Sequence, residues 1–220
     1  MQNLVSKPFG FPPHSQKTKP LYGLTFKFSY YIIIETLFER TKMMEILEFD
    51  KLQDGSVSKQ ILQILTSCSQ EFVPPLCMRS STLQKDFTNS SESNDGVPYA
   101  YFEMIKEQNA FIAEADRTVA GFMSFKKDFV SDIITNEYLP DIYISTVITG
   151  KNFRRQGITK GFYEKLSEIY NDRNIFTRTW STNISHTKLL KSFGFEEFKR
   201  IKDDRGKGID TVYYLKRVGK

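Results

Sequence analysis

Tyr143-Ile-Ser-Thr-Val-Ile-Thr-Gly-Lys-Asn-Phe-Arg-Arg-Gln-Gly-Ile-Thr159 joins a β-branched run to a short basic loop that contains one glycine near its end. The β-branched run predicts a strand over about 141–149. The positions after the loop are apolar at helical spacing and comprise Ile158, Phe162, Leu166 and Ile169. This order places free backbone N–H groups and the positive end of a helix at the exit of a strand. The stretch therefore predicts a site for a phosphate group.

The segments before this stretch predict two helices and three strands. A first strand is expected at 45–49, followed by a helix from Asp54 or Ser56 and a second helix over about 98–108. Two apolar runs, 110–115 and 119–125, surround a short polar turn and predict a hairpin. A polar segment, 80–97, is expected to form a loop between the two helices.

The segments after the stretch predict a strand at 175–182, a short helix at 184–193 that ends at Gly194, and an antiparallel pair at 195–201 and 211–215. The whole order is β-α-α-β-β-β-α-β-α-β-β. We therefore expect an α/β (α+β) domain with a mixed, largely antiparallel central sheet of about seven strands, flanked by about four helices.

The chain of 220 residues is expected to form one domain, 43–220, after an N-terminal extension, 1–42. The extension carries six basic and two acidic residues, and so four of the five net positive charges. It does not resemble a secretory signal, because its apolar part comes late and no small-residue cleavage site follows. A transit peptide, or translation that begins at Met43 or Met44, remains open. We expect this extension to lie outside the fold or to be flexible.

The composition of the chain excludes several classes of partner. The folded part has little excess basic charge, so no nucleic-acid partner is expected. No apolar run reaches ~18 residues, so no membrane span is expected. Cys68 and Cys77 have no nearby histidine and form neither a metal motif nor a disulfide framework, so no metal is expected. Reduced thiols point to the cytoplasm.

The loop itself supplies the binding groups. Gly157 has no Cβ and lets a ligand approach the backbone. The N–H groups of Gln156, Gly157, Ile158 and Thr159 stand at the start of the helix without intrahelical partners. Arg154 and Arg155 add positive charge. An ordinary loop with two solvated arginines is the alternative interpretation.

Two motifs together resemble a known family. Arg154-Arg-Gln-Gly-Ile-Thr159 resembles motif A of the GNAT superfamily of N-acetyltransferases, written Arg/Gln-x-x-Gly-x-Gly/Ala. Downstream, Thr179-Trp-Ser-Thr-Asn-Ile-Ser-His-Thr-Lys-Leu-Leu-Lys-Ser-Phe-Gly-Phe195 resembles motif B, a strand that ends in Asn, a short helix and Gly-Phe. The resemblance covers about residues 45–217.

This resemblance implies acetyl-CoA as the co-substrate. Val147 and Thr149 would offer backbone groups to the pantetheine arm at a splayed sheet edge. The loop from Arg154 to Thr159 would hold the pyrophosphate, with Arg155 and Lys160 near the phosphates. Asn183 would contact the cofactor, and it is equally placed to cap the helix that follows.

The chain departs from the family pattern at two positions. Thr159 replaces the last small residue of motif A, so the close approach of a ligand is tighter there. Leu190 stands where many relatives have a tyrosine that protonates the leaving thiolate. Another group or water would have to supply that proton. The reference pKa of a thiol, ~8.5, makes it a fair leaving group without a dedicated acid.

Two residues are candidates for the catalytic base. Tyr143 lies eleven residues before Arg154, where some relatives carry a glutamate, and strict alternation would put it on the face of Val147 and Thr149. Glu114 on the hairpin is the second candidate. Either side chain could instead pack or orient the substrate.

We therefore expect an N-acetyltransferase that moves an acetyl group from acetyl-CoA to a primary amine of a small molecule, a peptide or a protein by direct attack. A CoA-binding module without catalysis is the alternative. A nucleotide-binding protein unrelated to CoA is disfavoured, because the chain lacks both Gly-x-x-x-x-Gly-Lys-Ser/Thr and Gly-x-Gly-x-x-Gly. The acceptor and the oligomeric state are left open, with a homodimer as one possibility.

Overall fold

The computed structural model describes residues 44–81, 95–130 and 141–219. The predicted extension 1–42, part of the predicted loop at 80–97 and residues 131–140 lie outside these ranges. None of the described helices is long and apolar enough to cross a membrane.

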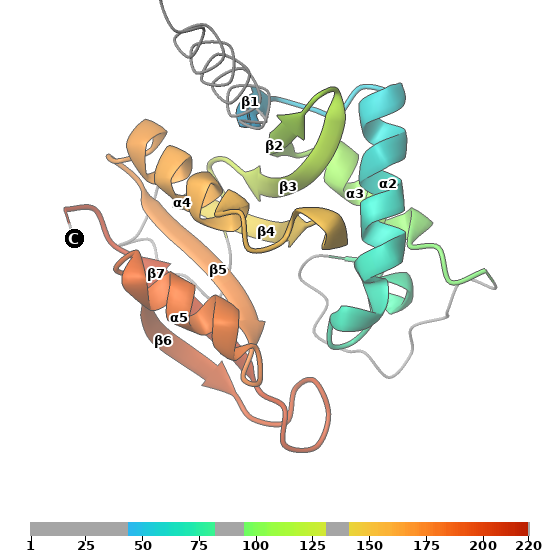
Figure 1. Cartoon of the computed structure of the whole chain (residues 1–220). Coiled ribbons are helices and arrows are strands. Elements are labelled where there is room, and N and C mark those ends of the chain that lie inside the picture. The colour runs from blue at the N-terminus through green and yellow to red at the C-terminus, as the bar shows by residue number, and fades with distance from the viewer. Residues whose placement is uncertain (1–43, 82–94, 131–140, 220) are drawn as a thin grey trace, which may run out of the picture. The chain divides into compact units, whose positions relative to one another are not determined.

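One sheet of seven strands organises the described residues, in the order β1-β2-β3-β4-β5-β7-β6 (Figure 1). The strands are β1 (Met44–Phe49), β2 (Asn109–Ala115), β3 (Thr118–Lys126), β4 (Asp141–Thr149), β5 (Asn174–Trp180), β6 (Glu196–Ile201) and β7 (Thr211–Lys216). Only β4 and β5 are parallel, and every other neighbouring pair is antiparallel. The predicted mixed and largely antiparallel sheet is therefore confirmed.

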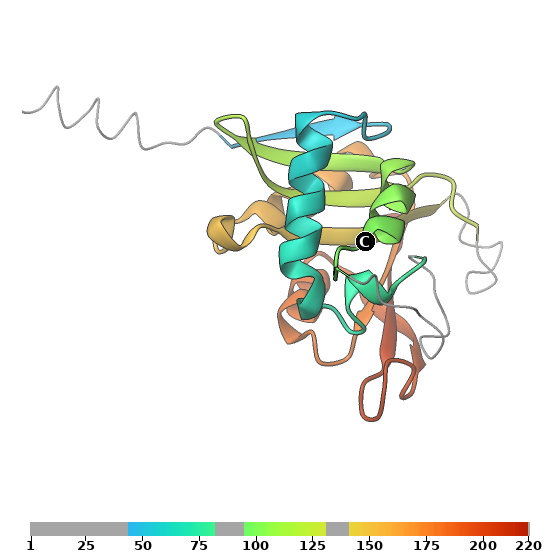
Figure 2. The ribbon, with the colours of Figure 1, turned by 90° about the vertical axis from the view of Figure 1, so that its right-hand side faces the viewer.

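Four α-helices among the described residues cover the sheet in two pairs. The first pair, α2 (Ser56–Cys68) and α3 (Tyr99–Lys106), lies over one face, as the view in Figure 2 shows. The second pair is α4 (Ile158–Ile169) and α5 (Ile184–Ser192), which lie on the opposite face. Short 3₁₀ turns follow α2 at Ser69–Glu71 and Leu76–Met78 and follow β4 at Lys151–Phe153.

The core is divided by the sheet in the same way. One buried cluster unites α4 and α5 with the sheet through Phe162, Leu166 and Leu190. A second cluster unites α2 and α3 with the other face through Ile61, Leu65 and Phe102. A smaller aromatic cluster forms beside the second, from Phe129, Tyr143, Phe176, Tyr213 and Leu215. Each helix thus buries the apolar stripe that its sequence predicts.

A β-bulge in β4 alters which side chains share a face. Ser124 of β3 pairs with Thr146, whereas the next residue, Phe125, pairs with Ile144, so Ser145 is the extra residue. Ile144 and Val147 therefore face the α4 side, while Tyr143 joins the aromatic cluster on the other face. The expectation that Tyr143 shares a face with Val147 and Thr149 is wrong, because strict alternation does not survive a bulge.

Candidate functional site

The centre of the site is the place where β4 and β5 part. The two strands pair in parallel only where Asp141–Ile144 of β4 lie beside Asn174–Thr177 of β5. There the Thr177 hydroxyl donates to the Ile144 carbonyl at 3.1 Å. Beyond this point β5 continues with β7, and β4 continues with β3. A cavity of about 550 Å³ lies along the opening, lined by residues 143–149 of β4 and 177–180 of β5.

The glycine loop closes one end of this cavity. Gly157 precedes the first residue of α4 with φ 79° and ψ 2°, and no side chain caps the helix there. Arg155 also has a positive φ, 63°, which is uncommon for a residue with a side chain. An uncapped helix start leaves the N–H groups of its first turn without intrahelical partners, and residues 157–160 line the cavity. The helix start beside the cavity is thus uncapped by any side chain, and the anion site itself stays a prediction.

Thr159 fits the loop instead of obstructing it. Its hydroxyl lies 3.0 Å from the hydroxyl of Thr149, the last residue of β4. Lys160 lines the cavity and also forms an ion pair with Glu164 at 3.2 Å. The loop, the strand end and the first turn of α4 are thus tied together.

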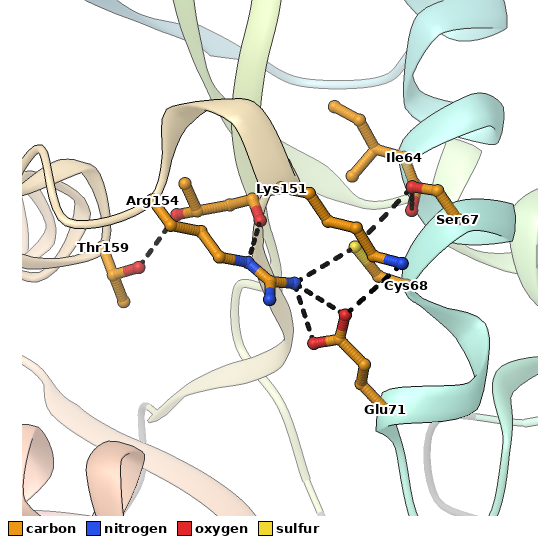
Figure 3. Close-up of polar contacts among 8 residues, drawn as sticks. Ile64, Ser67, Cys68, Glu71, Lys151, Arg154 and Thr159 are labelled. Atoms are coloured by element: carbon orange, nitrogen blue, oxygen red, sulfur yellow. Dashed lines mark hydrogen bonds and ion pairs between the residues drawn. The ribbon is translucent and has the colours of Figure 1, made fainter.

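Arg154 lines the cavity, but its charge is paired with an acidic residue. Figure 3 shows its guanidinium turned toward the end of α2, where it meets Glu71 at 2.7 Å and the Cys68 sulfur at 3.6 Å. Lys151 approaches the same carboxylate at 3.8 Å. The hydrogen bond that the Arg154 guanidinium donates to the Glu71 carboxylate raises the pKa of Arg154. The expected charge of this residue is therefore largely balanced by Glu71.

Asn183 caps α5 and also lines the cavity. Its side-chain oxygen accepts from the His186 N–H at 3.3 Å, and its amide donates to Thr179 at 3.3 Å. The cap that the sequence allowed is present, and the same residue borders the cavity, so the cap leaves the predicted cofactor contact open as a prediction.

His186, to which the sequence analysis gave no role, lies on the cavity wall. Its Nε2 lies 2.7 Å from the Tyr163 hydroxyl, and its Nδ1 lies 3.4 Å from the Thr179 hydroxyl. Burial lowers the pKa of the imidazole to about 4, so the ring is neutral near pH 7. One turn on, Leu190 is fully buried in the core beneath α5 and does not line the cavity.

The two predicted base candidates lie in different places. Tyr143 lines the cavity, stacks on Phe129 at 4.6 Å, and is 1 % exposed. Burial raises the pKa of its phenol to about 12, so it is protonated at neutral pH. Glu114 does not line the cavity; it lies on β2 opposite Glu45 of β1.

The end of the cavity near Tyr143 contains three arginines that the sequence analysis missed: Arg79, Arg178 and Arg205. Arg178 could have been identified from the sequence, because it is a charged residue inside the apolar strand Asn174–Trp180. Arg79 and Arg205 follow irregular segments and reach the site only through the tertiary fold. No group of three metal-ligating side chains is found among the residues that the structure describes.

Comparison with known proteins agrees with this architecture. Residues 76–195 match the model of the acetyltransferase (GNAT) family. An N-acetyltransferase from Staphylococcus aureus Mu50 is similar in structure, with a TM-score of 0.53 and 15 % identity, over 79 % of this chain and 99 % of that one. The ribosomal-protein-S18-alanine N-acetyltransferase from Escherichia coli superposes with a TM-score of 0.52 and 12 % identity, over 81 % and 96 %. Comparison with curated proteins finds no sequence match.

The matched family model spans more than half of the 220 residues, and the chain belongs to the GNAT family of acetyltransferases. Members of this family are acyltransferases, and the two similar structures have the same fold as this chain.

Proposed function

We propose that this protein transfers an acetyl group from acetyl-CoA to a primary amine of a small molecule or a protein. The observation that carries the proposal is the opening between β4 and β5, with the Gly157 loop at one end. A strand edge left open in this way offers backbone groups to an extended ligand. A helix start with free N–H groups suits a pyrophosphate.

In this proposal the pantetheine arm lies along β4, and the backbone of Val147 and Thr149 binds it. The pyrophosphate binds the N–H groups of residues Gln156 to Thr159, with Arg155 and Lys160 nearby. Arg154 serves the loop through its bond with Glu71, which fixes the loop against α2. Asn183 borders the cofactor from the end of β5.

The reaction proposed is direct attack. The neutral amine adds to the thioester carbonyl, backbone N–H groups of β4 stabilise the oxyanion, and the C–S bond then breaks. The nitrogen loses one proton, and the thiolate takes up one proton. The reference pKa of a thiol is ~8.5, so water can supply the proton that a tyrosine at position 190 would have given.

The base is solvent in this proposal. Among the described residues that line the cavity, Glu71 is the one carboxylate, and it is engaged by Arg154. Tyr143 is protonated at neutral pH, so it fits an orienting donor better than a base. Glu114 does not border the cavity, and we assign it no catalytic role. Positive charge nearby lowers the pKa of a bound ammonium and so favours its loss of a proton.

One observation favours a second candidate, a CoA-binding module without catalysis: Leu190 lies in the core where an acid would be expected. Thermal unfolding with acetyl-CoA, ATP and NAD, followed by thiol release with a panel of amines, separates the two. Acetyl-CoA at ~100 times its dissociation constant should add about 2.7 kcal/mol to the free energy of unfolding.

Thiol release that depends on an added amine supports the transferase. A shift with acetyl-CoA and no thiol release with any amine supports the module. The absence of any shift with acetyl-CoA overturns both. We also propose the cytoplasm as the compartment, since Cys68 and Cys77 are free thiols.

A further inference from the structure

The three arginines gather at the end of the cavity far from the glycine loop. Arg79 follows the 3₁₀ turn Leu76–Met78, Arg178 lies on β5, and Arg205 lies in the β6–β7 connection. Arg79 and Arg205 are only 9 % and 8 % exposed, and Arg178 is partly buried. Residues from three distant parts of the chain thus bring three guanidinium groups to one place.

The three arginines lie on the face of the sheet that bears α2 and α3. Tyr143, which borders the cluster, precedes Thr149 by six residues, and because of the bulge at Ser145 this corresponds to about 17 Å along the strand. It also faces away from α4, whose first turn holds the phosphate loop. The cluster is therefore separate from the pyrophosphate site at the other end of the cavity.

Aromatic rings and carbonyl groups hold two of the arginines in place. The Arg79 guanidinium lies 5.4 Å from the centre of the Phe72 ring, and its Nε donates to the Pro74 carbonyl at 2.9 Å. Arg205 lies 5.8 Å from the centre of the Trp180 ring, and its Nε donates to the Thr211 hydroxyl at 2.9 Å. The Phe72 and Trp180 rings are 5.5 Å apart.

The bond from Nε leaves the Nη2 group of Arg79 available. Its Nη2 atom is buried and has no hydrogen-bond partner among the described residues. Burial and the charges of Arg79 and Arg178 lower the pKa of Arg205 to about 9. Asp204 acts on Arg205 in the opposite direction, and Arg178 lies beside the phenols of Tyr143 and Tyr213.

The charge of the cavity lining is strongly positive among the residues that the structure describes. Six cationic side chains of these ranges line the cavity, three near the glycine loop and three in this cluster, and Glu71 is the one described carboxylate beside them. Arg154 and Lys151 already engage that carboxylate. Like charges and an unsatisfied donor are costly to bury, and a bound anion would relieve both costs.

We propose that the acceptor is an amine that carries a small anionic group, a carboxylate or a phosphate, which binds the free donor of Arg79 in the field of Arg178 and Arg205. The amine end then points toward the opening between β4 and β5. This inference rests on the proposed transferase for the word acceptor, but the anion site itself can be tested without turnover.

Trp180 provides a direct reading of that site, because it is the only tryptophan in the chain and lines the cavity beside Arg205. We would titrate matched acidic and neutral probes, glutarate against glutaramide and phosphoethanolamine against ethanolamine, and follow tryptophan fluorescence. At least one acidic probe should bind about ten times or more tightly than its neutral partner, as a hydrogen bond to a charged group implies. The stronger acidic probe distinguishes a carboxylate from a phosphate. Equal affinity within both pairs overturns the proposal.

The matched variants are Arg79→Gln and Lys199→Gln, which remove one positive charge each. Lys199 is exposed on β6 and does not line the cavity. Arg79→Gln should weaken the acidic probe about tenfold or more and leave the neutral probe unchanged, whereas Lys199→Gln should change neither. An Arg79→Gln protein that binds the acid as well as the wild type contradicts the inference. If Arg79→Gln does not fold, Arg79→Lys keeps the charge and should still bind the acid more weakly than the wild type.

If the protein binds acetyl-CoA, measurements of turnover provide a second test. Arg79→Gln should raise the KM for an acidic amine about tenfold or more and leave the KM for acetyl-CoA within about twofold. A preference for ethanolamine over phosphoethanolamine and for neutral amino amides over amino acids would overturn the inference. If acetyl-CoA does not bind, the proposed function fails, and the fluorescence titration still decides whether the anion site exists.

Discussion

Gly157 has no side chain, and this affects both the backbone conformation of the loop and the space that is open to a ligand. Its φ of 79° lies in the left-handed region, and a Cβ added there would meet no atom within 4 Å of the unliganded protein. Gly208, in the connection before β7, has the same φ and the same open space, but it does not line the cavity. The two glycines therefore form a matched pair.

We expect Gly157→Ala and Gly208→Ala to lower the free energy of unfolding by a similar amount, about 1–2 kcal/mol, since both force alanine into the left-handed region. Only Gly157→Ala should weaken acetyl-CoA binding, because its new methyl group would stand where we propose that the pyrophosphate approaches. Urea unfolding and calorimetric titration measure the two effects. Equal weakening by both variants would show that strain, and not ligand approach, is the cause.

Asp141 at the start of β4 carries a pH-dependent penalty. It is fully buried, and neither carboxylate oxygen has a hydrogen-bond partner within the described parts of the chain. Burial raises its pKa to about 6, and nearby Asn174 offsets part of that rise. Since the folded pKa exceeds the unfolded value near 3.8, folding favours the protonated form, and its contribution to stability is lost as pH rises from about 4 through 6.

Asp141→Asn removes this titration. The variant should gain stability relative to the wild type as pH rises, with a larger gain at pH 7.5 than at pH 4.5. Urea unfolding at the two pH values tests it. Asp210 has the opposite sign, since the Arg200 hydrogen bond lowers its pKa, and its contribution to stability is lost only as pH falls below about 4. Asp210→Asn should therefore be less stable than the wild type by nearly the same amount at both pH values. A gain for Asp141→Asn that does not grow with pH would contradict the assignment.

At the scale of elements, the order of strands and helices was predictable because each carries its own periodic pattern. The helix from Ile158 and the strand Asn174–Trp180 begin within a residue of where the sequence predicts them. The bulge at Ser145 was not predictable, since nothing local marks it, and it alone moves Tyr143 to the other face. The arginine cluster was missed for a related reason: its members meet only once three distant segments have folded together.

Helix α5 shows how a family position can change its role. Leu190 is 0 % exposed and packs in the same cluster as Phe162 and Phe195. Leu190→Ala should lower the free energy of unfolding by about 2–5 kcal/mol, because it leaves a cavity in the core. Leu190→Met, which keeps the volume, should cost less than about 1.5 kcal/mol.

Urea unfolding separates these two variants of α5. The same preparations also test function, since Leu190→Met should leave acetyl-CoA binding unchanged if the side chain packs only in the core. A loss of cofactor binding in a stably folded Leu190→Met protein would show that position 190 borders the cofactor after all.

At the scale of the whole molecule, the sheet separates two kinds of positive charge. On the α4 side, backbone N–H groups and the Gly157 loop suit a phosphate ligand. On the α2 side, Arg79, Arg178 and Arg205 suit an anion that belongs to the acceptor. The opening between β4 and β5 joins the two ends. Two anionic substrates that enter from opposite faces would thus meet where the sheet parts.

The central claim, that acetyl-CoA binds along the open edge of β4, is tested most directly by hydrogen exchange with mass spectrometry. Peptides that cover 145–149 and 155–161 should exchange more slowly in saturating acetyl-CoA, since the cofactor would occupy their free N–H groups. The same concentration of ATP should leave the 145–149 peptide unchanged. Unchanged exchange in both peptides at saturating acetyl-CoA, or protection confined to other segments, would contradict the account.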